Sequence, residues 1–273
     1  MNKKSYKLIA FDMDGTLLNS QKQITLGSID MINRAFDEGK EVVLATGRCI
    51  AELKEYLDQL PRLRYIVCVS GALVYDVHDN IVIYENAIPK EIIKSIFAET
   101  EKEEMMIHIL NKDSIVQKGC MQNMAYYGMG VYTELFHNVA TEVDDLKKYY
   151  YNHEISADKI NLYHHSTKGR TRTKDRLKGL DIVMADAEKT SVEISSKGTT
   201  KGTGLEMLCS HLNINMSETI AVGDADNDLD VLKRAGLSIA MGNANDKVKE
   251  ICDVQVKDCD HEGCSEAIEK YLL

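Results

Sequence analysis

Two aspartates, Asp12 and Asp14, follow the first apolar run of the chain, residues 8–11, which predicts a short buried strand. At about 4 Å and an effective dielectric of about 20, two such carboxylates repel each other by ~4 kcal/mol. A fold keeps such a pair only where something neutralises it, most simply a divalent cation or a shared proton. Gly15 lets the chain turn sharply after the pair, and Thr16 can cap the next segment. The spacing therefore predicts a chemical site at the end of this strand.

Three further polar clusters lie at or just after the ends of predicted strands. They are Thr46-Gly47-Arg48 after residues 41–45, Lys201 at the start of a predicted helix, and Asp224 with Asp226, Asn227 and Asp228 after residues 219–222. Taken singly, each has an ordinary structural reading as a turn, a solvated lysine or a capped helix start. A lysine at a helix N-terminus opposes the helix dipole, however, so a nearby anion explains Lys201 better.

We expect the four clusters to meet, because ligands of open parallel sheets collect at the C-terminal ends of the strands. The combined set holds carboxylates, one hydroxyl, one ammonium and backbone N–H groups freed by glycine. Carboxylate oxygens suit a hard cation, and the donors suit phosphate oxygens. The sequence thus predicts a site for Mg²⁺ together with a phosphate.

The elements that position these clusters alternate between strand and helix at both ends of the chain. Strands are predicted at residues 8–11, 41–45, 65–69, 219–222, 237–241 and 253–256, and the segments between and after them have helical periodicity, as between Thr25 and Gly39 and over 50–60, 201–212, 245–251 and 262–272. Such a βαβ rhythm with short turns indicates an α/β fold with a doubly wound parallel sheet.

The rhythm is interrupted in the middle of the chain. Residues 73–77 and 81–85 predict a hairpin, 86–89 a linker, and 105–118, 158–164, 181–185 and 190–195 further strands, while 120–152, rich in Tyr and Met, stays unassigned. We therefore predict a discontinuous core domain formed by residues 1–85 and 190–273, with an α+β domain inserted at 86–189.

Composition narrows the class of protein. The 273 residues carry a formal net charge of −10, which argues against a general nucleic-acid or membrane binder. The polar, basic start is followed by an apolar run too short for a signal peptide, and no window reaches the ~18 apolar residues of a membrane span. Seven scattered cysteines predict reduced thiols in a cytoplasmic protein. Cys259, His261 and Cys264 cluster, but they lack the second pair of a zinc site.

The motifs, taken in order, resemble those of the haloacid dehalogenase (HAD) superfamily of phosphatases, and within it the Cof-type group with an inserted subfamily IIB cap. Asp12-x-Asp14-Gly15-Thr16 is similar to the first motif, Ala45-Thr46-Gly47-Arg48 to the second in its Cof-type form, Lys201-Gly202 to the third, and Gly223-Asp224-x-x-Asn227-Asp228 to the fourth. Met241-Gly242-Asn243-Ala244 and the segment around Gly263 are similar to later Cof-type features. The resemblance implies a HAD-like, Rossmannoid core and a cap that selects the substrate.

The resemblance also implies a reaction, the hydrolysis of a phosphomonoester. Asp12 would be the nucleophile that forms an aspartyl-phosphate, and Asp14 the general acid and later the base that activates water. The Thr46 hydroxyl, the Gly47 N–H and Lys201 would hold the transferring phosphoryl oxygens. Arg48 could reach the phosphate or the leaving group.

A metal shell is implied by the same motifs. Asp12 and Asp224 would bind Mg²⁺ through carboxylate oxygens, and Asp14 through its backbone carbonyl. Asn227 would join or order this shell, and Asp228 would support it from outside, directly or through water.

The inserted domain would close over the site and select the leaving group. The candidate contacts are Tyr126, Tyr127, Tyr132, His164, His165 and the basic stretch 170–178. Packing inside the cap explains the tyrosines more simply, and a solvated face explains the basic stretch.

Two departures from the family pattern stand out. Ser70-Gly71-Ala72 occupies the place of the usual Asn-Gly-Ala, which could alter a contact near the metal or the substrate. Asp226 adds an acid inside the fourth motif. We expect neither to abolish activity.

Three other functions remain open from the sequence. A mutase-type phosphoryl transfer, as in a phosphomannomutase, shares the core motifs and differs only in its product. A phospho-acceptor signalling module also groups acids, Thr and Lys around Mg²⁺, but in roughly 120 residues without an insertion. A metal-binding protein without catalysis is disfavoured by the intact Asp12, Asp14 and Lys201. Sugar phosphates, pyridoxal phosphate, flavin mononucleotide and other small phosphorylated metabolites all remain candidate substrates, and the oligomeric state is not indicated.

Overall fold

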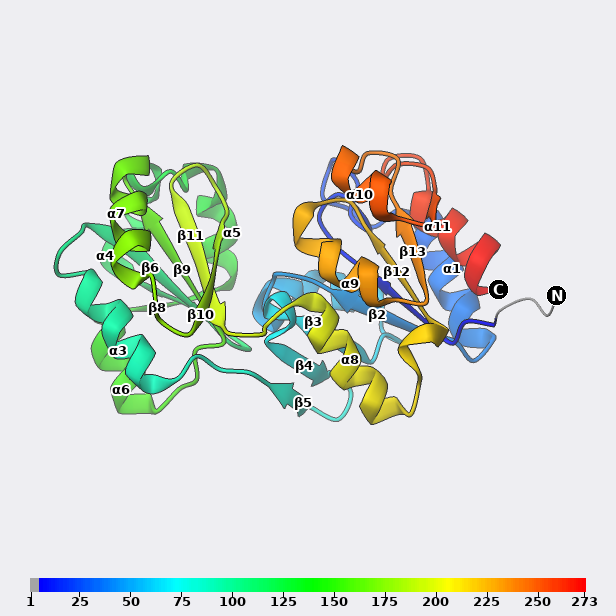
Figure 1. Ribbon diagram of the computed structural model, residues 1–273, viewed down its shortest axis with the longest axis horizontal. Helices are drawn as coiled ribbons and strands as arrows, with labels where there is room; N and C mark the ends of the chain where they lie inside the picture. The colour runs from blue at the N-terminus through cyan, green and yellow to red at the C-terminus, as the bar shows by residue number, and fades with distance from the viewer. Residues whose placement is uncertain (1–4) are drawn as a thin grey trace. The chain divides into compact units, whose positions relative to one another are not determined.

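The computed structural model describes residues 5–273, which form two compact units (Figure 1). The first unit contains the chain up to Arg48, then Leu53–Glu85 and Thr200–Leu273, and the second contains Cys49–Glu52 and Asn86–Thr199. Along the sequence, the second unit therefore ends ten residues beyond the predicted boundary at 189. The reason is β11 (Ser191–Ser196). This strand pairs with β9 and β10 of the second unit and is not part of the first unit.

The first unit is built on one eight-stranded sheet with the order β14-β13-β12-β1-β2-β3-β4-β5. The strands are β1 (Leu8–Phe11), β2 (Glu41–Ala45), β3 (Tyr65–Cys68), β4 (Leu73–Asp76), β5 (Ile81–Glu85), β12 (Thr219–Gly223), β13 (Leu237–Ala240) and β14 (Val254–Gln255). All run in one direction except β4, which is antiparallel to both of its neighbours, β3 and β5, and forms a hairpin with β5 at one edge. The predicted α/β fold with a parallel core sheet is confirmed. Because β1 lies between β12 and β2, the ends of these three strands are neighbours.

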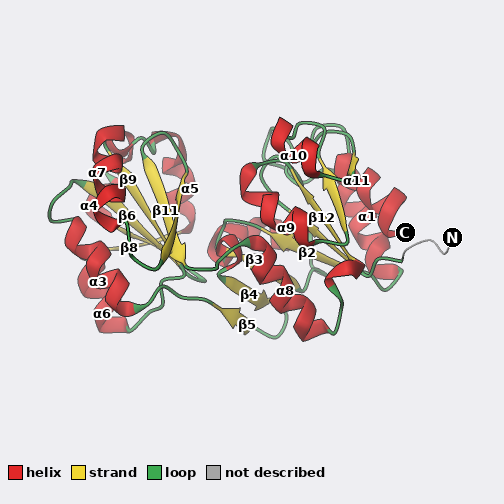
Figure 2. Cartoon of the chain, in the orientation of Figure 1, coloured by secondary structure: helices red, strands yellow, loops and turns green. Residues whose placement is uncertain are grey.

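Helices cover both faces of this sheet (Figure 2). They are α1 (Leu26–Asp37), α2 (Lys54–Gln59), α8 (Lys201–Leu212), α9 (Leu229–Arg234), α10 (Asp246–Ile251) and α11 (Gly263–Ala267), which is extended by a π turn at Ile268–Leu272. Helices α1 and α11 pack together, whereas α9 contacts both α8 and α10. Thr25 caps α1 as predicted, since its hydroxyl accepts the N–H of Ser28.

The start of α8 is fixed by a close backbone approach. Gly71 has a φ of +94°, and a Cβ at this position would lie 1.9 Å from the carbonyl oxygen of Thr200. Only glycine fits such a contact. Thr200 in turn caps α8 in a reciprocal pair with Thr203. The Ser70-Gly71-Ala72 turn thus sets where Lys201 begins its helix.

The second unit has a six-stranded sheet with the order β10-β11-β9-β6-β7-β8. The strands are β6 (Met105–Leu110), β7 (Ser114–Gln117), β8 (Ala140–Val143), β9 (Lys159–His164), β10 (Ile182–Asp186) and β11; the helices are α3 (Lys90–Glu99), α4 (Lys118–Met121), α5 (Thr133–Val139), α6 (Leu146–His153) and α7 (Thr167–Leu177). The pairing is antiparallel except between β7 and β8.

Two apolar clusters cover the two faces of this second sheet. Ile107, Ile109, Ile160 and Leu162 meet side chains of α3, α6 and α7, whereas the opposite face packs against the segment that the sequence left unassigned. The cluster on that opposite face consists of Met106, Val116, Met121, Met124, Tyr127, Met129, Phe136 and Tyr163. The methionines and Tyr127 are therefore packing residues.

The basic stretch at 170–178 lies on α7 and is balanced by acids of the same unit. Arg172 pairs with Glu103 at 2.6 Å, and Lys174 with Asp186 at 2.5 Å. This charge neutralisation gives the stretch a structural explanation. In the part of the chain that the structure describes, no helix is long and apolar enough to cross a membrane.

A buried histidine makes the second unit sensitive to acid. His108 is 1% exposed, and its ring lies 2.7 Å from the Ser114 hydroxyl. Burial, reinforced by the charge of Lys159, lowers the pKa of His108 from 6.5 to about 3. In the unfolded chain, the His108 imidazole takes up a proton below about pH 6.5, whereas in the folded chain it does so only near pH 3. The contribution of His108 to the free energy of unfolding is therefore lost as the pH falls through this window.

We therefore expect His108 to contribute a decrease in the free energy of unfolding between pH 7 and pH 5, which the difference between wild type and a variant without this imidazole isolates from the other titrating groups. The variant His108→Gln, which cannot take up this proton, should show a slope shallower by up to ~1.4 kcal/mol per pH unit. Denaturant titrations at several pH values measure both slopes, and the exposed His153→Gln serves as control. Identical slopes in wild type and His108→Gln would contradict the role of His108.

Candidate active site

The ends of β1 and β12 bring three carboxylates together. Asp12 follows β1 directly, and Asp224 and Asp228 follow β12, which pairs with β1 in parallel register. One oxygen from each of the three lies within 4.8 Å of the others. We call these three residues the acidic triad. Asp12 is 6% exposed and Asp228 1% exposed, so the triad is largely shielded from water.

Lys201, the first residue of α8, lies against two members of the triad. Its Nζ is 2.5 Å from Oδ1 of Asp12 and 2.7 Å from Oδ1 of Asp228, although these residues are far apart in sequence. Lys201 is 2% exposed. Burial lowers the pKa of its ammonium, but the charges of Asp12 and Asp228 outweigh burial and hold the pKa above its ordinary value. The lysine is therefore a permanent cation beside Asp12 and Asp228.

One ammonium does not balance three carboxylates. Burial raises the pKa of Asp12 to about 7 against the attraction of Lys201, and burial together with Asp228 raises the pKa of Asp224 to about 6. A raised pKa means that the ionised forms are destabilised by one another and by the loss of water. A bound cation would remove this strain, so the donor chemistry of the triad fits a metal ion.

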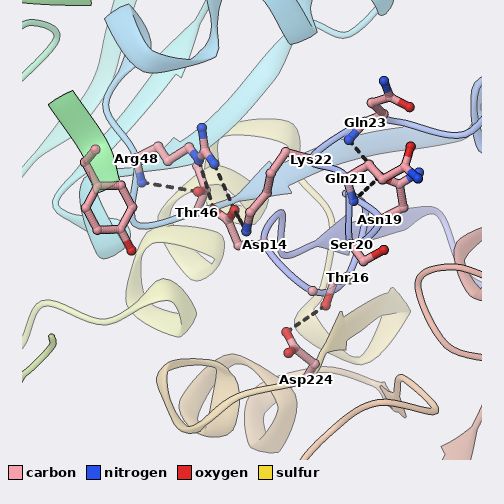
Figure 3. Close-up of polar contacts among 12 residues, drawn as sticks. Asp14, Thr16, Asn19, Ser20, Gln21, Lys22, Gln23, Thr46, Arg48 and Asp224 are labelled. Atoms are coloured by element: carbon pink, nitrogen blue, oxygen red, sulfur yellow. Dashed lines mark hydrogen bonds and ion pairs between the residues drawn. The ribbon is translucent and has the colours of Figure 1, made fainter. Parts of the chain in front are cut away.

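Further hydrogen bonds hold Asp224 and Asp228 in place. Asp224 Oδ1 accepts the Thr16 hydroxyl at 3.1 Å (Figure 3), and Asp228 Oδ2 accepts the backbone N–H groups of Asp224 and Ala225 at 3.1 and 3.2 Å. Gly15 permits the approach, because a Cβ there would lie 2.5 Å from Asp224 Oδ2.

Asp14 is directed toward cations rather than toward the triad. Arg48 donates to both of its oxygens, from Nε at 2.9 Å and from Nη2 at 2.8 Å, and Lys22 donates to Oδ1 at 2.8 Å. Figure 3 shows Asp14 between these two side chains. Burial raises the pKa of Asp14, but the hydrogen bonds and charges of Arg48 and Lys22 prevail and lower it to about 2.

The Thr46-Gly47-Arg48 turn follows β2, the other neighbour of β1. Thr46 is buried, its hydroxyl accepts the N–H of Arg48 at 3.2 Å, and its backbone bonds to Val67 and Ser70. These bonds hold the turn beside the end of β1.

The predicted site residues do not all lie in one cluster. The structure joins Asp12, Asp224, Asp228 and Lys201, and it joins Asp14 to Arg48. Asn227 is exposed, whereas Asp228, predicted as an outer support, is buried beside Asp12 and Asp224.

The additional acid of the fourth motif is engaged elsewhere. Asp226 pairs with Lys247 at 2.7 Å and accepts the Asn245 amide at 3.0 Å. It therefore belongs to a surface network rather than to the triad.

Two residues that contact the first motif were not predicted from the sequence. The contact of Lys22 with Asp14 could not be predicted, because the sequence does not show that the polar loop around Lys22 folds back on Asp14. Asn243, whose amide donates to the Gly15 carbonyl at 2.7 Å, lies in a segment noted only for its resemblance to the family.

The candidate contacts in the second unit are mostly engaged in packing. His164 is buried against Thr173 at 2.9 Å, and Tyr132 donates to Glu188 at 2.6 Å. Tyr126 is 46% exposed and stacks on His165, with ring centroids 4.9 Å apart.

Comparison of the sequence with known proteins identifies its family. Residues 9–268 match the family described as haloacid dehalogenase-like hydrolase. The chain is 28% identical to the 5-amino-6-(5-phospho-D-ribitylamino)uracil phosphatase of Bacillus subtilis, over 98% of this chain and 96% of that protein. It is 27% identical to the HMP-PP phosphatase of Yersinia pseudotuberculosis, with the same coverage of 98% and 96%.

The fold is also shared with solved structures. A haloacid dehalogenase-like hydrolase from Bacteroides thetaiotaomicron superposes with a TM-score of 0.83 at 25% identity, covering 97% of this chain and 99% of that one. A protein from Thermotoga maritima gives a TM-score of 0.82 at 25% identity, with 97% of both chains covered. The chain therefore belongs to the haloacid dehalogenase-like hydrolases, in the Cof-type group of phosphatases that its motifs predicted.

Proposed function

We propose that this protein is a Mg²⁺-dependent phosphatase that hydrolyses small-molecule phosphomonoesters through an aspartyl-phosphate on Asp12. The observation that carries the proposal is the buried arrangement of Asp12 with Lys201, Asp224 and Asp228. A carboxylate held in place by an ammonium, next to two further acids, has the charge and geometry of a nucleophile that works beside a cation.

By the family resemblance, Asp12 and Asp224 would hold Mg²⁺ through carboxylate oxygens and Asp14 through its backbone carbonyl, and Asp228 lies close enough to Asp12 and Asp224 to support that shell. Asn227 would serve in the surrounding shell. When bound, the ion supplies positive charge that offsets the repulsion between the Asp12 carboxylate and an anionic substrate.

In the first half-reaction, a carboxylate oxygen of Asp12 attacks phosphorus while the bond to the leaving oxygen breaks. Lys201 orients this carboxylate, and Lys201, the Thr46 hydroxyl and the Gly47 N–H would support the phosphoryl oxygens. Asp14 gives a proton to the leaving oxygen.

In the second half-reaction, Asp14 takes a proton from the water that attacks the aspartyl-phosphate, which releases phosphate and restores Asp12. Because Arg48 and Lys22 outweigh burial and hold the pKa of Asp14 at about 2, its carboxyl group is ionised and has a lone pair with which to accept this proton. The proton for the first half-reaction can arrive with the substrate, because a phosphomonoester has its second pKa near 6.

The second unit is proposed to select the part of the substrate beyond the phosphate, within the class of small phosphorylated metabolites. Named relatives act on such molecules, among them a phosphoribitylaminouracil. None of the seven cysteines, all of which lie in the described residues, forms a disulfide, which fits a reducing, cytoplasmic compartment.

Metal removal provides the first test. We expect thorough treatment with EDTA to lower phosphate release at least ~100-fold and added Mg²⁺ to restore it, because three carboxylates would then face the substrate with one ammonium. Phosphate release is measured over a panel of sugar phosphates, pyridoxal phosphate and flavin mononucleotide. Full activity after chelation would remove the metal from the mechanism, and an isomerised sugar phosphate in place of free phosphate would indicate a mutase.

A further inference from the structure

Three hydrogen bonds from two cations fix the plane of the Asp14 carboxylate. The two bonds from Arg48 form a fork on both oxygens, and the bond from Lys22 adds a third donor from a different segment (Figure 3). A bidentate guanidinium determines orientation as well as charge. Of these partners, only Arg48 belongs to a sequence motif of the family.

Lys22 is held in place by a tightly bonded turn. Its backbone has a φ of +60°, and its N–H donates to the carbonyl of Asn19 at 2.9 Å. The side chain of Asn19 accepts the N–H groups of Gln21 and Gln23 at 3.0 and 2.9 Å, as Figure 3 shows. A non-glycine residue persists in this left-handed conformation where its surroundings over-determine it. The turn therefore fixes the point from which the Lys22 side chain reaches Asp14.

Tyr56 of α2 connects the two cations. Its hydroxyl donates to the carbonyl oxygen of Lys22 at 3.3 Å, and its ring faces the guanidinium of Arg48, with the Arg48 Cζ 5.4 Å from the ring centroid. Tyr56 is 5% exposed. Contacts thus run in a closed ring from Asp14 to Arg48, Tyr56, Lys22 and back to Asp14.

We propose that Lys22 and Tyr56 are positioning residues that hold the Asp14 carboxyl group in the orientation needed to protonate the leaving group. This inference rests on the proposed function, in which the proton passes from Asp14 to the leaving oxygen as the phosphorus–oxygen bond breaks and its electron pair stays on that oxygen. The contact between Lys22 and Asp14 is largely exposed, so it adds little to stability. Its loss should therefore change the kinetics rather than the fold.

The test compares two esters of similar shape, phenyl phosphate and p-nitrophenyl phosphate. Phenolate is the more basic leaving group and needs a proton more than p-nitrophenolate does. A misplaced Asp14 carboxyl group should therefore lower kcat/KM mainly for phenyl phosphate. We expect Lys22→Met to lower kcat/KM for phenyl phosphate about tenfold and that for p-nitrophenyl phosphate by less than about threefold. Lys22→Arg should retain most of the activity on both, because it keeps a donor.

Tyr56→Phe keeps the ring beneath Arg48 and removes only the bond to Lys22. It should shift the ratio of the two kcat/KM values in the same direction as Lys22→Met, by about threefold. Adding it to Lys22→Met should have no further effect, because both changes act through the same side chain. Lys7→Met, which removes a similarly exposed lysine paired with Glu218, is the matched control.

The outcomes separate the positioning role from the proposed function. An unchanged ratio in Lys22→Met, whether activity is retained or lost equally on both esters, would overturn the positioning role and leave the phosphatase proposal intact. A wild-type protein that releases phosphate neither from these esters nor from the panel of sugar phosphates, pyridoxal phosphate and flavin mononucleotide would instead overturn the proposed function, and the positioning role with it.

Discussion

Replacing Asp12 with asparagine should lower kcat for phosphate release by at least about a thousandfold. The amide has nearly the shape of the carboxylate but is far too weak a nucleophile to attack phosphorus. The position is singled out by its surroundings, since Asp12 is 6% exposed and its Oδ1 lies 2.5 Å from Lys201 Nζ. The measurement is the rate of phosphate release from p-nitrophenyl phosphate in the presence of Mg²⁺.

A matched control exists within the fourth motif. Asp226→Asn makes the same chemical change at an exposed acid that pairs with Lys247, and it should leave phosphate release within about twofold of wild type. Because Asp12→Asn is isosteric, its circular dichroism spectrum and melting curve should show a folded protein. Turnover of Asp12→Asn above a few per cent of wild type would exclude Asp12 as the nucleophile.

Much of the fold and the site could be predicted because both depend on local patterns. Buried parallel strands are continuous apolar runs, and such runs at residues 8–11, 41–45 and 219–222 revealed the strands whose ends carry Asp12, Thr46 and Asp224. The order in which strands pair then brings the ends together, and the sheet topology of α/β folds makes that step predictable.

What the sequence could not supply depends on long-range geometry. The strand β11 reads like a core strand, and nothing in its own residues shows that it pairs with β9 rather than with β1. Likewise, Asn227 and Asp228 are adjacent in one motif, and only the path of the short turn after β12 buries Asp228 against Lys201 while Asn227 stays exposed. Lys22 is a third case, because its role depends on a turn that brings it back to a residue eight positions earlier.

Replacing Lys201 with methionine should affect stability and catalysis together, and the two effects can be separated. Methionine approximates the aliphatic stem but leaves Asp12 and Asp228 buried without their cation, a change that costs about 3–5 kcal/mol when one partner of a buried pair is removed. The loss of a donor to the transferring phosphoryl group should lower kcat by a further ~100- to 1000-fold.

Denaturant unfolding with and without Mg²⁺ measures the first effect, and phosphate release measures the second. Bound Mg²⁺ should restore part of the stability of Lys201→Met, because it supplies positive charge beside the same carboxylates. The double variant Lys201→Met/Asp228→Asn removes one acid along with the lysine, so it should recover stability but not turnover. A Lys201→Met protein as stable as wild type would show that the ammonium does not neutralise the buried acids. If this variant also kept its turnover, Lys201 would have no part in holding either the nucleophile or the phosphate.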